Sequence, residues 1–454
     1  MIASLAFFPV GEVIWSQEEQ GENAQVIQID VLNEIARHLG KRNFQEALRL
    51  FDALPAEEAA KTPVRIMQAT VLNSAGRTAE AKSIANSILL TEAKNTEAMM
   101  ILADAAAIEN NPRDRRVILD RVISTDANHV RALNDLGSIS LGNRNLRIAA
   151  GYFDRALAAD PDNGEALVNR AAVYRYSREQ RNAERLLNRA VGLYPDWARP
   201  LHERARLYRS AQFDADALED LEAALALEPD NYWILTDHGS VLTDLQRKPE
   251  ALISFNRAIK INPDIFIAYV YSAGIKDELG DYAGAEHDYA VLARLRPDYY
   301  FAFEALGVLR MRNKQWALAR DAFLEAYKQA PKEFSYAILA SLNWMRAGRQ
   351  TDPKQFIAQV LRTAPRDSLD FGILKVFHDL NGDVELAGRI EREQNVATKI
   401  RMMYYLALYY DIRGSKTLAD RYYLMVKDID TPAGIEWRLN EMAIAERKLI
   451  QEKK

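Results

Sequence analysis

The segment ALNDLGSISLGNRNLRIAAGYFDRALAADPDN, residues 132–163, contains one unit of a pattern that recurs along the chain. The unit closes on a proline, and later prolines keep a constant spacing of 34 residues, at Pro161, Pro195, Pro229, Pro263, Pro297, Pro331 and Pro365. A fixed period of this length is the sequence signature of a repeat protein, in which one supersecondary unit is copied and stacked.

Small and bulky apolar residues stay in phase with the prolines. Alanine recurs twelve positions before the proline, a bulky apolar residue follows four positions later, and a second alanine often follows after three more, as in Ala149, Phe153 and Ala156. The spacing i, i+4, i+7 places these side chains on one face of a helix. An upstream group, exemplified by Leu136 and Gly137, marks a second helix whose glycine or alanine is the point of closest contact. Each unit is therefore predicted to be an A helix followed by a B helix.

Short turns separate the predicted helices. Residues 74–77, 279–282 and 347–349 each contain a glycine, which is expected to supply the left-handed backbone conformation that ends the A helix. The proline ends the B helix, and the Asp-Asn or Asp-Tyr beside it is expected to cap the next A helix.

These residues resemble the tetratricopeptide-repeat (TPR) family over residues 28–432. The resemblance implies an all-α fold, a right-handed superhelix or α-solenoid of about twelve helix-turn-helix repeats. Residues 28–333 would form repeats 1–9, residues 334–432 the divergent repeats 10–12, and residues 433–454 a capping helix over the last repeat, with a tail. Repeats are expected to begin near residues 28, 62, 96, 130, 164, 198, 232, 266, 300, 334, 368 and 399. The C-terminal part also distantly resembles NlpI-like bacterial TPR lipoproteins, although their lipid-attachment cysteine is absent.

Residues 1–27 form an apolar N-terminal segment followed by a polar linker. The apolar stretch resembles the back half of a secretory signal peptide, without its basic region or cleavage site. This pattern predicts export, for instance to a bacterial periplasm. The alternative is an apolar cap on the first repeat in a cytoplasmic protein.

Composition argues against several classes of function. The 59 basic and 64 acidic residues give a net charge of −5, so no positive field would attract nucleic acid. The chain has no cysteine and six scattered histidines, and it lacks nucleotide-binding, metalloprotease and hydrolase motifs. His238 is expected to be a packed or hydrogen-bonded residue. We expect no enzyme, no metal, no cofactor and no stable membrane span.

The TPR resemblance implies a concave groove, lined chiefly by the A helices, that binds a protein or peptide. Repeats 4–6 place a basic, amide-bearing zone on this face, which is suited to acidic peptides. Its residues are Arg131, Asn134, Ser138, Asn169, Arg175, Tyr176, Arg199, His202, Arg206 and Arg209. Asn169 and Arg199 match positions of the family's carboxylate clamp, but Asn134, Ser138 and Glu203 depart from it.

Repeats 7–10 predict an aromatic and aliphatic zone. Its residues are Trp233, Ile267, Val270, Tyr271, Phe301, Val308, Met311 and Ile338, with Tyr299 and Tyr300 leading into repeat 9. Aromatic and methionine side chains are typical of interface hot spots. The alternative interpretation is that several of them belong to the core between repeats.

The leading hypothesis is a non-enzymatic scaffold or adaptor that binds a peptide or a partner protein in the groove, in a bacterial envelope complex. One alternative is a structural spacer that forms homo-oligomers, and another is a chaperone-like helper for exported proteins. A C-terminal set of tyrosines offers a route to self-association or, equally, a packed core. The set comprises Tyr404, Tyr405, Tyr409, Tyr410, Tyr422 and Tyr423.

Overall fold

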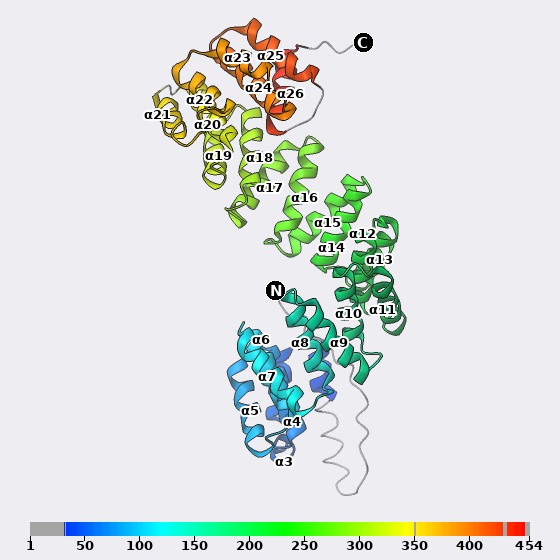
Figure 1. The fold of residues 1–454 in the computed structure, drawn as a ribbon. Helices are drawn as coiled ribbons and strands as arrows, with labels where there is room; N and C mark the ends of the chain where they lie inside the picture. Colours follow the sequence, from blue (N-terminus) through cyan, green and yellow to red (C-terminus); the bar gives the residue numbers. More distant parts are fainter. Residues whose placement is uncertain (1–30, 32, 349–350, 430–433, 450–454) are drawn as a thin grey trace. The chain divides into compact units, whose positions relative to one another are not determined.

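The computed structural model describes residues 31, 33–348, 351–429 and 434–449, and all regular secondary structure in these residues is helical (Figure 1). The predicted segment 1–27 lies outside them. The chain divides into two compact units, Met1–Pro229 and Asp230–Lys454, here called unit 1 and unit 2. Each unit is a solenoid of stacked helix-turn-helix repeats, which confirms the predicted all-α fold class.

Unit 1 holds six repeats. Residues 31 and 33–40 are helical and pair with α2 (Phe44–Asp52), which is followed by the single turn α3 (Ala56–Ala59). The next A and B helices are α4 (Thr62–Ser74) with α5 (Thr78–Thr91), α6 (Thr96–Ile108) with α7 (Pro112–Thr125), α8 (Val130–Gly142) with α9 (Leu146–Ala159), α10 (Gly164–Tyr176) with α11 (Gln180–Leu193), and α12 (Ala198–Ser210) with α13 (Asp214–Leu227).

Unit 2 holds the remaining repeats and a last helix. The pairs are α14 (Tyr232–Asp244) with α15 (Lys248–Ile261), α16 (Phe266–Glu278) with α17 (Tyr282–Leu295), α18 (Tyr300–Arg312) with α19 (Trp316–Gln329), α20 (Phe334–Arg346) with α21 (Thr351–Val360), α22 (Leu369–Asp379) with α23 (Asp383–Glu391), and α24 (Val396–Ile412) with α25 (Lys416–Asp428). The final helix is α26 (Gly434–Arg447). The period of 34 residues therefore placed the A helices correctly.

Size complementarity fixes how the two helices of a repeat approach each other. A Cβ atom built on Gly137 would lie 2.4 Å from the ring of Phe153, and one on Gly239 would lie 2.8 Å from the ring of Phe255. In repeat 5 the equivalent positions are Ala171 and the smaller Leu187, which share one buried cluster. The repeat thus combines glycine with phenylalanine, or alanine with a smaller side chain, to keep the same dense packing.

The turn between the A and B helices has a left-handed residue in every repeat that the structure describes in full there. Glycine supplies it at Gly76, Gly280, Gly348, Gly382 and Gly414, as predicted for such turns. Elsewhere the position holds a residue with a side chain, with φ between 54° and 63°, namely Arg42, Asn110, Arg144, Arg178, Gln212, Gln246 and Lys314. Glycine is therefore not required, and these seven turns carry a conformation that is unfavourable for most L-residues.

The start of several A helices is capped as expected. Asn95, Asn163 and Asn231 each precede an A helix, and the side chain of each accepts a hydrogen bond from a backbone amide of the first turn. His129 fills the same place before α8 and accepts from the amide of Ala132. The capping residue therefore follows the 34-residue period too.

The C-terminal tyrosines belong to the core. Tyr404, Tyr405, Tyr409, Tyr410 and Tyr423 are all buried, and the half-buried Tyr422 stacks on Tyr410 with 5.6 Å between ring centroids. Of the two interpretations offered by the sequence, self-association through these side chains is thus wrong and packing is right. The physical reason is that α24 is covered by α22, α25 and α26, so that its tyrosines are enclosed.

The predicted capping helix is confirmed as α26, which packs against α24 and α25 (Figure 1). Its side chains also reach A helices far back in the sequence, which the sequence did not predict. Glu436 accepts a hydrogen bond from Ser335 on α20 (2.5 Å), and Arg438 donates one to Asp277 on α16 (2.6 Å). The last helix therefore forms part of the A-helix face of unit 2.

Candidate partner-binding site

The second residue of each A helix shows how the two units differ. In unit 1 this position holds Glu97, Arg131, Glu165 and Arg199, so its charge alternates along the stack. In unit 2 it holds Trp233, Ile267 and Phe301. The A-helix face is therefore polar in unit 1 and apolar over three successive repeats of unit 2.

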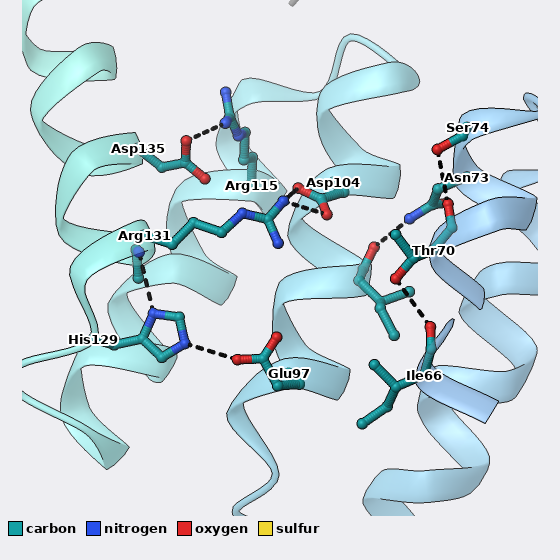
Figure 2. Close-up of polar contacts among 12 residues, drawn as sticks. Ile66, Thr70, Asn73, Ser74, Glu97, Asp104, Arg115, His129, Arg131 and Asp135 are labelled. Atoms are coloured by element: carbon teal, nitrogen blue, oxygen red, sulfur yellow. Dashed lines mark hydrogen bonds and ion pairs between the residues drawn. The ribbon is translucent and has the colours of Figure 1, made fainter. Parts of the chain in front are cut away.

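In unit 1, Arg131 is paired with a carboxylate of the preceding A helix (Figure 2). Its guanidinium donates hydrogen bonds of 2.6 and 2.7 Å to the two carboxylate oxygens of Asp104 on α6. Burial raises the pKa of Asp104, and the nearby positive charge of Arg131 opposes that rise. Arg131 therefore stabilises a buried carboxylate and ties repeat 4 to repeat 3.

Two further contacts lie beside this pair in Figure 2. Arg115 on α7 forms an ion pair with Asp135 on α8, at 3.0 Å. His129 Nε2 lies 3.4 Å from a carboxylate oxygen of Glu97, and hydrogen bonding to His129 lowers the pKa of Glu97. Arg115 stands where the family pattern expects alanine, so this departure is used for an inter-repeat ion pair.

The predicted amides of unit 1 are largely buried. Asn134 is 8% exposed and donates a hydrogen bond of 3.0 Å to Asn163, which caps α10. Asn169 is 7% exposed and accepts a hydrogen bond of 2.6 Å from Arg199. Its amide nitrogen lies 3.5 Å from the hydroxyl of Ser138. These groups therefore hold the A helices together, and the carboxylate-clamp geometry is not formed.

The remaining basic residues of the zone surround one carboxylate. Glu203 accepts a hydrogen bond of 3.4 Å from Arg175 and one of 3.0 Å from Arg206. Burial alone would raise the pKa of Glu203, but the positive charges of Arg206, Arg175, His202 and Arg199 outweigh it and lower this pKa. Arg199 also pairs with Glu165, and Arg209 is half-buried in the last turn of α12.

The expectation of a basic stripe in repeats 4–6 therefore needs correction. Asp104, Glu165 and Glu203 supply negative charge to the same face, and each contacts at least one of the predicted arginines. The period contained the missing signal, because Glu165 occupies the position equivalent to Arg131 and Arg199. The result is a ladder of alternating charges between neighbouring A helices.

The apolar zone of unit 2 separates into surface and core. Trp233, Ile267 and Phe301 have exposed fractions of 55%, 40% and 49%. Tyr271 is half-buried, with its ring stacked on Phe255 at 5.2 Å. The predicted contacts Val308, Met311 and Ile338 are instead core residues with at most 7% exposure, because they face the helix of a neighbouring repeat. The exposed set Trp233, Ile267 and Phe301 is called the apolar stripe below.

Unit 2 also contains a cavity of about 690 Å³ at the Phe301 end of the apolar stripe. Residues from α18, α20 and α26 line it, together with others from α16, α17 and α24. The sequence did not predict this cavity, because its walls are brought together by the return of α26 onto the A helices.

The described residues give little indication of other chemistry. His238 is half-buried and its Nδ1 lies 2.8 Å from the hydroxyl of Ser254, as expected for a hydrogen-bonded histidine. No group of three or more histidine, aspartate or glutamate side chains in this part of the chain could hold a metal ion. Among the helices described, none combines the length and apolar character needed to cross a bilayer.

Solved structures similar to this chain are themselves distant in sequence. PilF of Pseudomonas aeruginosa is 19% identical, with a TM-score of 0.42, over 46% of this chain and 94% of its own. YrrB, described as a TPR protein with an unusual peptide-binding site, is 20% identical, with a TM-score of 0.36, over 41% of this chain and 95% of its own. The Cut9–Hcn1 hetero-tetramer of the APC/C is 16% identical, with a TM-score of 0.48, over 66% of this chain and 58% of the other.

No curated protein matches the sequence significantly. The tetratricopeptide-repeat family, in contrast, matches residues 120–198, 202–264 and 276–334. These three segments include the charge ladder and the apolar stripe. The chain therefore contains tetratricopeptide repeats, a class of repeat that generally mediates protein–protein interactions and to which no enzyme family corresponds.

Proposed function

We propose that this protein is a non-enzymatic scaffold or adaptor that binds a partner polypeptide on the A-helix face of unit 2. The observation that carries the proposal is the apolar stripe. Trp233, Ile267 and Phe301 occupy the same position in three successive repeats, and each is at least 40% exposed.

Recurrence distinguishes the apolar stripe from the other exposed apolar residues. Single residues such as Leu90 and Val117 are exposed as well, which is normal for a protein surface. Side chains at one repeat position lie on the same face of neighbouring A helices, so that one extended segment can contact all of them. Covering apolar surface contributes about 25 cal/mol per Å², and aromatic side chains are frequent hot spots.

Capture of partners from native extracts tests the proposal. The Trp233→Ala/Ile267→Ala variant is compared with wild-type protein and with Ile253→Ala, in which an equally exposed apolar residue on the B helix α15 is removed. We expect a partner that is retained by the control and lost by the double variant, with circular dichroism unchanged. Equal capture by all three proteins would contradict the proposal.

The alternatives predict other outcomes of the same experiment. A chaperone-like helper would capture many unfolded clients through the apolar stripe rather than one partner, and a self-assembling spacer would capture its own chain. The burial of Tyr404 and Tyr405 removes the surface on which the sequence based self-association, so the adaptor is favoured.

The proposal places the protein outside the cytoplasm, in a bacterial envelope complex. Its support is the apolar N-terminal sequence and the polar linker after it. Cell fractionation with an antibody against unit 2 tests the location; recovery in the cytoplasmic fraction alone would contradict it and leave the binding proposal intact.

A further inference from the structure

The cavity in unit 2 has an apolar and aromatic wall. Its aliphatic lining comes from Val270, Leu292, Val308 and Ile435, and its rings are those of Tyr289, Tyr299, Phe301 and Tyr336. Phe301 is both part of this wall and the last member of the apolar stripe. The cavity is therefore continuous with the surface proposed above for partner binding.

Three carboxylates line the same cavity, namely Glu304, Glu333 and Glu436. Glu436 is only 4% exposed, and its Oε1 accepts hydrogen bonds from Ser335 (2.5 Å) and Tyr405 (2.6 Å). Within the described part of the chain its Oε2 accepts none. Glu304 accepts one hydrogen bond, from the Tyr336 hydroxyl to its Oε2. Each carboxylate thus keeps one oxygen for a further donor.

The two arginines of the cavity are already engaged. Arg438 donates a hydrogen bond of 2.6 Å to Asp277, and Arg401 donates one of 3.1 Å to Asp370. Neither aspartate lines the cavity, so each neutralises an arginine from behind. The three lining carboxylates therefore leave the cavity with a negative charge that nothing else in its wall balances.

The titration of Glu304 agrees with this charge balance. Burial raises the pKa of Glu304, the hydrogen bond from Tyr336 opposes the rise, and the charge of Glu436 adds to it. Two carboxylates that disfavour each other's ionisation are stabilised together when a positive charge comes between them.

We propose that this cavity binds a cationic side chain, lysine or arginine, of the partner polypeptide that lies along the apolar stripe. The aliphatic stem contacts the apolar wall, the charged head interacts with the aromatic faces, and its N–H groups donate to Glu304 and Glu436. An anionic side chain fits less well because Arg401 and Arg438 are paired. This proposal rests on the function proposed above, and it adds the chemistry of one partner residue.

Calorimetric titration of the full chain with three labelled peptides tests the proposal. Each peptide carries leucines around one central residue, which is arginine, its uncharged isostere citrulline, or glutamate. We expect the arginine peptide to bind about tenfold more tightly than the citrulline peptide, since hydrogen bonds to charged groups are the stronger ones. We expect the glutamate peptide to bind most weakly.

Variants locate the binding. Glu304→Gln keeps the shape of the cavity and should abolish the preference for arginine over citrulline. Glu325→Gln, an exposed carboxylate on the B helix α19, should leave the preference unchanged. Equal binding of the arginine and citrulline peptides, tighter binding of the glutamate peptide, or a preference that survives Glu304→Gln would each overturn the proposal, as would the absence of binding by all three.

Two further arms separate this proposal from its surroundings. Agmatine, a free guanidinium compound, should compete only weakly, because it lacks the peptide contacts; full competition would mean a small-amine site and would overturn the proposal. If the arginine preference holds while partner capture is indifferent to Trp233→Ala/Ile267→Ala, only the proposed function fails.

Discussion

Arg131 on α8 and Asp104 on α6 lie on the A helices of successive repeats, joined by two hydrogen bonds of 2.6 and 2.7 Å. The side chain of Asp104 is 15% exposed and that of Arg131 is 35% exposed. A residue that the sequence suggested as a partner contact is thus a structural link within unit 1. Its removal should affect stability before it affects binding.

Arg131→Met should lower the free energy of unfolding by about 1–2 kcal/mol, because the Asp104 carboxylate would remain buried without its counterion. Urea unfolding followed by circular dichroism measures the change. The matched control is Arg49→Met, whose partner Glu46 is on the same helix and whose side chain is 76% exposed. The control should change by less than about 0.5 kcal/mol; similar losses in both variants would contradict the prediction.

Glu203 should make stability depend on acidity. Its pKa is lower in the folded protein than in the unfolded chain, so its contribution is complete above the unfolded value of about 4.3 and is lost as the pH falls through the folded value. Glu203→Gln should therefore destabilise the protein at pH 7, and the difference from wild type should shrink below about pH 4. Urea midpoints at the two pH values decide; a difference that stays constant with pH would exclude this role.

Gly239→Ala should destabilise unit 2 by about 1 kcal/mol or more, because the new Cβ would lie 2.8 Å from the ring of Phe255. Adding Phe255→Leu should recover much of the loss, since repeat 5 packs Ala171 against Leu187. Thermal unfolding of the single and double variants measures the coupling.

The control for this pair is Gly274→Ala on α16, where a Cβ would meet no atom within 4 Å. It should stabilise the helix by up to about 1 kcal/mol through propensity alone. A loss at Gly274 equal to that at Gly239 would show that close contact with Phe255 is not the cause.

Arg144→Gly should stabilise unit 1 by about 0.5–1 kcal/mol, because φ at this position is 58° and glycine adopts such a backbone without steric cost. Asn110→Gly, at φ 54° in the equivalent turn, should gain less, because asparagine tolerates the left-handed region. In the opposite direction, Gly280→Ala should cost about 1 kcal/mol. Urea unfolding of the three variants gives the order, and a larger gain for Asn110→Gly than for Arg144→Gly would refute the argument.

Contacts within one repeat could be predicted from the sequence. Gly137 and Phe153, or Gly239 and Phe255, lie 16 residues apart in every repeat, so a common period and two helices are enough to bring them together. The same reasoning correctly placed the exposed residues Trp233, Ile267 and Phe301, although it assigned the buried residues Val308 and Met311 to the surface. A helix pattern has one apolar face, but only neighbours decide which part of that face is covered.

The sequence by itself determined the period, the paired helices and the residues that set their distance, because these depend on local geometry and on contacts at one fixed separation. Only the tertiary structure decided the partner of each charge, such as Asp104 for Arg131. It also decided the cavity, because Arg438 meets Asp277 across 161 residues and Glu436 meets Ser335 across 101. Such contacts depend on the accumulated rotation of many stacked repeats, and no single repeat encodes that sum.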